Sequence, residues 1–124
     1  MTEKFKISQD ILIRALEILA SEARQRYTWF PNAQGDMSSF IEAVNNVFDD
    51  ASITDALEDN QIIYDRKVTQ ALRELDDAVD PVDEYRGEEE IINDPLMQVV
   101  REKAARVLEL IKVSKREGST VEII

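Results

Sequence analysis

Apolar residues recur at intervals of three and four positions along most of the chain. The first run extends from Ile11 to Ala23. This period places the apolar side chains on one face of a helix. It predicts an amphipathic helix over residues 9–27, which ends before Pro31 and Gly35 because both residues interrupt helices.

A second run predicts a helix over residues 37–49, with Asp36 or Ser38 as its capping residue. The helix would carry one apolar face. That face consists of Met37, Phe40, Ile41, Val44, Val47 and Phe48.

A third run begins at the sequence SITD, residues 52–55, which has the spacing of a capping box. The apolar positions continue to Val79, so we expect a helix over residues 52–79 that is either continuous or broken near Asn60. A continuous helix would be about 40 Å long, which is more than a small bundle needs. That overhang leaves a homodimer open.

The last helix has the clearest start. Asp94 can cap it and Pro95 fits its first position, and the apolar stripe then predicts a helix over residues 95–116 that ends before Gly118. The tail TVEII, residues 120–124, alternates weakly, so it can either dock as a short extended piece or contribute to self-association.

These elements predict an all-α fold. We expect a single-domain bundle of four or five amphipathic helices over residues 1–124, with an acidic connection before the last helix and a short extended C-terminal tail. The composition agrees, since 44% hydrophobic and 33% charged residues are typical of a globular chain.

The absence of some residue types limits the reactions and binding sites that the chain can support. The chain has no Cys, no His and only three Gly, so thiolate or imidazole chemistry and the glycine-rich phosphate loops cannot be built. We therefore expect no cofactor, no metal and no catalytic residue. The net charge of −11 disfavours direct binding to nucleic acid or anionic membrane, and no secretory signal is visible, so we expect a cytoplasmic protein.

Most of the negative charge lies in one stretch. Residues 76–95, DDAVDPVDEYRGEEEIINDP, hold nine carboxylates and one Arg, a net charge of −8, whereas the rest of the chain carries only −3. The stretch does not fit a calcium loop, because the register set by Gly87 fails at three ligand positions. A solvated connection and a surface for a basic partner both stay open. The partner-binding hypothesis uses Asp80, Asp83, Glu84, Tyr85, Glu88, Glu89 and Glu90.

The sequence RQRYTWFP, residues 24–31, groups aromatic and basic side chains. Rings beside arginines are typical of interface hot spots, but they equally seal the open end of a bundle. The secondary interface candidates are Arg26, Tyr27, Trp29 and Phe30.

One enzymatic alternative uses carboxylates alone. DALE (55–58) followed by ELDD (74–77) resembles the Glu-x-x-Glu and Glu-x-x-Asp motifs of all-α nucleotide pyrophosphohydrolases, although the first motif begins with Asp. That resemblance implies a magnesium-dependent hydrolase. In a continuous helix, however, Glu58 and Glu74 would lie about 24 Å apart, whereas paired catalytic metals need about 4 Å.

The leading hypothesis is a non-catalytic acidic protein-interaction module, most concretely an inhibitor of a basic protein; a protein that acts on nucleic acid is one such target. In general character the chain is similar to immunity proteins and antitoxins that neutralise basic nuclease toxins, which is an analogy of class. A structural or scaffold subunit is the first alternative, and the magnesium hydrolase is the second.

Overall fold

The computed structural model describes residues 7–29 and 39–116. In these residues the chain forms seven α-helices, one π-helical segment and no β-strand, which confirms the all-α prediction. None of these helices combines the length and the apolar composition that crossing a bilayer requires. The elements are α1 (Gln9–Leu19), α2 (Glu22–Thr28), α3 (Phe40–Asn45), η1 (Asn46–Asp50), α4 (Ile53–Glu58), α5 (Arg66–Val79), α6 (Glu88–Asn93) and α7 (Pro95–Arg116).

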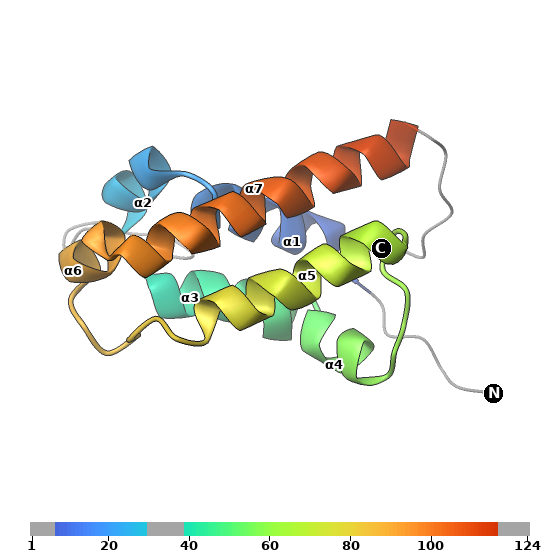
Figure 1. The fold of residues 1–124 in the computed structure, drawn as a ribbon, viewed down its shortest axis with the longest axis horizontal. Coiled ribbons are helices and arrows are strands. Elements are labelled where there is room, and N and C mark those ends of the chain that lie inside the picture. The colour runs from blue at the N-terminus through green and yellow to red at the C-terminus, as the bar shows by residue number, and fades with distance from the viewer. Residues whose placement is uncertain (1–6, 30–38, 117–124) are drawn as a thin grey trace.

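The long helix α7 runs the length of the molecule and organises the packing (Figure 1). It lies antiparallel to α5 and also covers α1, while α3 and η1 pack against α1 and α4 packs against η1. Leu16, Leu72, Leu75, Val100 and Val107 are fully buried in the core that joins these helices. Each such side chain stabilises the fold by about 2 kcal/mol.

The predicted helix over residues 9–27 is divided in two, so that prediction was wrong. The Ser21 hydroxyl accepts a hydrogen bond from a backbone amide of α2 at 3.2 Å and caps the new helix. Gln25 is fully buried, and its amide donates to the carbonyl oxygens of Ile18 and Leu19 at 3.0 and 2.9 Å. A side chain therefore donates to the last carbonyl groups of α1, of which Ile18 also accepts from the Ser21 amide at 3.3 Å.

The second helix begins later than expected and ends differently. α3 starts at Phe40, and its N-cap is Ser39, whose hydroxyl accepts from the Glu42 amide at 3.1 Å. The expected caps Asp36 and Ser38 lie outside the described residues. The last turn of the predicted helix is the π-helical segment η1.

The break near Asn60 is present. Asn60 and Tyr64 have φ angles of 56° and 63°, in the left-handed region, and the Asp65 carboxylate caps α5 by accepting from the Val68 amide at 2.8 Å. The capping box expected at residues 52–55 was wrong, because Ser52 is itself left-handed and leaves α4 without a side-chain cap.

Helix length no longer gives a reason to expect a homodimer. It required an unbroken helix over residues 52–79, and α5 has only 14 residues. A helix of about 21 Å fits within the length of α7 and leaves no overhang to cover.

The start of the last helix is confirmed. Asp94 accepts a hydrogen bond from the Leu96 amide at 2.9 Å, and Pro95 is the first residue of α7. The acidic connection before it is not all loop, because Ile91 and Ile92 are buried and hold the short helix α6 in place. Gly118 and the TVEII tail lie outside the described residues.

Candidate protein-binding surface

The acidic stretch covers one end of the molecule. It begins in the last turn of α5, turns at residues 80–87, continues through α6 and ends at the start of α7 (Figure 1). The antiparallel packing of α5 on α7 places both ends of the stretch together. Carboxylates from two helices and one turn are therefore gathered on the same end of the bundle.

Only two of the nine carboxylates have an ion-pair partner among the described residues. The Arg86 guanidinium contacts Glu90 at 3.1 Å and Asp94 at 2.9 Å, and the hydrogen bond that Arg86 donates to Glu90 is the main cause of the raised pKa of Arg86. The carboxylates without an ion pair in the described part of the chain are Asp76, Asp77, Asp80, Asp83, Glu84, Glu88 and Glu89.

Three of these acids lie where the helix does not favour them. Asp76, Asp77 and Asp80 occupy the C-terminal end of α5, where the helix dipole repels negative charge. Partial burial, followed by the charges of Asp77 and Asp80, raises the pKa of Asp76 above its ordinary value. The arrangement therefore costs the fold some stability, and local structure does not explain why the acids are there.

A cavity of about 380 Å³ opens among these carboxylates. Its walls combine the acids Asp76, Asp80, Asp83 and Glu84 with apolar side chains and Tyr85, whose side chain is 87% exposed. A hollow of this kind suits a side chain with an apolar stem and a positive head group. The apolar lining residues are Phe40, Val44, Val79 and Val82.

The predicted partner-binding residues divide into two groups. Asp80, Asp83, Glu84 and Tyr85 line that cavity, whereas Glu88, Glu89 and Glu90 form the first turn of α6 and line a separate open hollow of about 690 Å³. Glu90 is also the one member of the set that is paired, through Arg86.

Phe40 and Val44 were not among the residues predicted for this site. They precede the acidic stretch by 36 and 32 residues, and their spacing identified them only as members of an apolar helix face. Asp76 was within the stretch but outside the predicted set, and its position at the end of α5 was the available signal.

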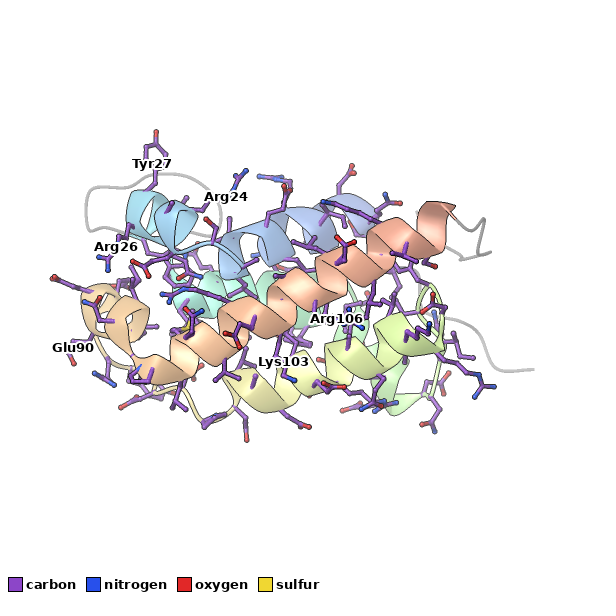
Figure 2. The ribbon with its side chains drawn as sticks, turned by 45° about the horizontal axis from the view of Figure 1, so that its top comes forward. Arg24, Arg26, Tyr27, Glu90, Lys103 and Arg106 are labelled. Carbon is purple, nitrogen blue, oxygen red and sulfur yellow. The ribbon has the colours of Figure 1, made fainter. Side chains whose placement is uncertain are left out.

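The secondary candidates do not form a second surface of the same kind. Trp29 is 1% exposed and packs edge-to-face on Phe40, with ring centroids 6.0 Å apart, so it seals the core. Arg26 contacts Glu22 and Asn93 at 2.9 and 2.8 Å. Tyr27 is 84% exposed and points away from the bundle (Figure 2), and Phe30 lies outside the described residues.

The break between α4 and α5 changes how the two motifs of the hydrolase alternative, DALE (55–58) and ELDD (74–77), lie relative to each other. Glu58 and Asp77 now line a common cavity of about 290 Å³, but Arg73 lies in it and donates to the Leu57 carbonyl at 2.9 Å. Glu74 instead forms an ion pair with Lys103 of α7 at 3.0 Å. In the described residues no group of three or more acidic side chains could hold a metal ion.

No protein-family model matches the chain, and searches of curated proteins and of solved structures also give no match.

Proposed function

We propose that this protein is a non-catalytic binding module that captures and inhibits a basic protein through its acidic end. The observation that carries the proposal is the cavity beside α5, where apolar walls, the exposed Tyr85 and carboxylates that form no ion pair with any described residue occur together. Carboxylates at the C-terminal end of a helix destabilise it, and positive charge on a bound partner would reduce that destabilisation.

The chemistry of the surface specifies the kind of partner. A lysine or arginine side chain can lay its methylene groups on Val79 and Val82 and place its head group among Asp80, Asp83 and Glu84. Tyr85 offers a ring for packing or for a cation–π contact. The surrounding negative charge would accelerate association with a basic protein, most strongly at low salt.

Charge reversal tests the proposal. We expect the fourfold variant Asp83→Lys, Glu84→Lys, Glu88→Lys and Glu89→Lys to lose a partner that the unaltered protein captures from native lysate at about 0.05 M salt and retains more weakly at about 0.15 M. Mass spectrometry identifies the captured protein, which should be basic. The Tyr85→Ala variant should fold normally and bind that protein at least about tenfold more weakly.

A second fourfold variant controls for net charge. It reverses four exposed acids away from the acidic end and changes the charge by the same amount, so it should keep the partner. The control positions are Asp49, Asp50, Asp59 and Glu102. A partner that is acidic, or that binds both variants equally, would contradict the proposal and favour a scaffold subunit that uses another face.

A further inference from the structure

A groove with the opposite charge lies between the first half of α5 and the last half of α7. Its volume is about 340 Å³, and three of the side chains that line it are cations, Arg66, Lys67 and Arg106. Figure 2 shows Lys103 and Arg106 reaching from α7 toward α5. In a chain with a net charge of −11, this is a local reversal of sign.

The three cations that line the groove, Arg66, Lys67 and Arg106, form no ion pair within the described part of the chain. The one acid in the groove, Glu74, is already paired with Lys103 at 3.0 Å, and that hydrogen bond is the main cause of its lowered pKa. Three cations and one carboxylate line the groove, a net charge of +2, and the charge of Arg106 also acts on Glu74.

The helix dipole gives a second, independent reason to expect an anion here. Arg66 and Lys67 are the first two residues of α5, where the dipole disfavours positive charge, and the first turn contains no acid. The Asp65 cap offsets part of this effect. An anion in the groove would interact favourably with the exposed cations and with the positive end of the helix.

Size and long-range charge decide which anion fits. A polyanion or an acidic protein would be repelled by the whole molecule, because its own charges would extend over the acidic remainder of the surface. A compact anion mainly experiences the charges within about 8–10 Å at physiological salt. A groove of this volume is at the small end of ligand sites.

We propose that the α5–α7 groove binds the phosphate group of a small ligand. The guanidinium groups of Arg66 and Arg106 come from two helices and can each present a planar pair of N–H donors to phosphate oxygens, with Lys67 as a third charge. Leu110 and Ala71 provide an apolar wall for a small organic body attached to that phosphate. The site is separate from the acidic end, so it does not depend on the function proposed above.

Titration with two probes tests the site. Inorganic phosphate and adenosine 5′-monophosphate are each added to the full chain in about 0.15 M chloride, and amide resonances are followed by NMR. We expect saturable shifts confined to residues 66–71 and 106–110, with a dissociation constant near or below about 1 mM. Tighter binding of the nucleotide would assign the phosphate to an organic ligand, and equal binding would assign it to free phosphate.

Matched variants make the outcome decisive. The double variant Arg66→Gln and Arg106→Gln should bind at least about tenfold more weakly, while Arg24→Gln, which neutralises an exposed arginine of α2, should bind normally. Thermal unfolding confirms that both variants are folded. Shifts that fail to saturate by about 20 mM, or that are equal in the two variants, would overturn the proposal.

Discussion

Asp76 is the side chain in which the cost of the acidic surface can be measured. Its pKa is raised mainly by partial burial and further by two neighbouring carboxylates, so its ionised form is disfavoured in the folded chain. For an acid with a raised folded pKa, the destabilisation is absent at low pH and develops as the pH rises through that pKa.

We therefore expect Asp76→Asn to stabilise the protein at neutral pH. The expected gain in unfolding free energy is about 0.5 kcal/mol, the size of a screened charge–dipole interaction. The gain should disappear as the pH falls through the raised folded pKa toward and below the ordinary value of 3.8. Urea unfolding at neutral pH and near pH 3 measures the difference. Glu102→Gln, at an exposed position on α7, should show no such gain, and an equal gain there would contradict the explanation.

At the scale of an element, the corner between α1 and α2 depends on one buried amide. Besides its two bonds to α1, Gln25 accepts a hydrogen bond from Arg101 Nε at 3.0 Å, and Arg101 Nη2 donates to the Ile92 carbonyl at 2.6 Å. Arg101 is itself 7% exposed, and burial lowers its pKa. The network joins α1, α2, α6 and α7.

Gln25→Ala should therefore lower the unfolding free energy by about 2–3 kcal/mol, because it removes the side-chain donor of the Ile18 and Leu19 carbonyls and one acceptor of the largely buried Arg101 guanidinium. Gln98→Ala is the matched control: Gln98 contacts Arg101 only through a longer bond of 3.3 Å and is exposed, so its loss should be below about 0.5 kcal/mol. Urea denaturation compares the two. A small effect at Gln25 would mean that the corner is held by apolar packing alone.

The elements show which parts of the fold local sequence could predict. The start of α7 was predictable because Asp94 and Pro95 stabilise a helix start through contacts with neighbouring residues. For residues 52–79 the sequence allowed either a continuous helix or a break near Asn60, and the structure has the break. The division of residues 9–27 was not evident from the apolar pattern, since the apolar period continues across it and the buried Gln25 at the corner also contacts Arg101, 76 positions away. The acidic chain segment of the candidate site could be found from its charge, whereas the apolar residues that α3 contributes, Phe40 and Val44, required the tertiary fold.

At the scale of the whole molecule, the net charge of −11 should make stability depend on salt. Repulsion among carboxylates is screened as ionic strength rises. We expect the unfolding temperature to increase by a few degrees between about 0.02 and about 0.3 M sodium chloride. Thermal unfolding followed by circular dichroism measures this.

The fourfold reversal of Asp83, Glu84, Glu88 and Glu89 provides the comparison. Each reversal adds two charges, so the variant carries −3 and should show a weaker dependence on salt. A variant that keeps the full salt dependence would show that the repulsion arises elsewhere on the surface.

The edge-to-face contact between Trp29 and Phe40 has a practical consequence. Trp29 is the single tryptophan of the chain, and the ring it packs against also lines the acidic cavity. Its indole emission is therefore an intrinsic optical signal that lies one aromatic ring from the cavity. Occupation of the cavity can be followed in the unlabelled protein, with no probe added to the charged surface itself.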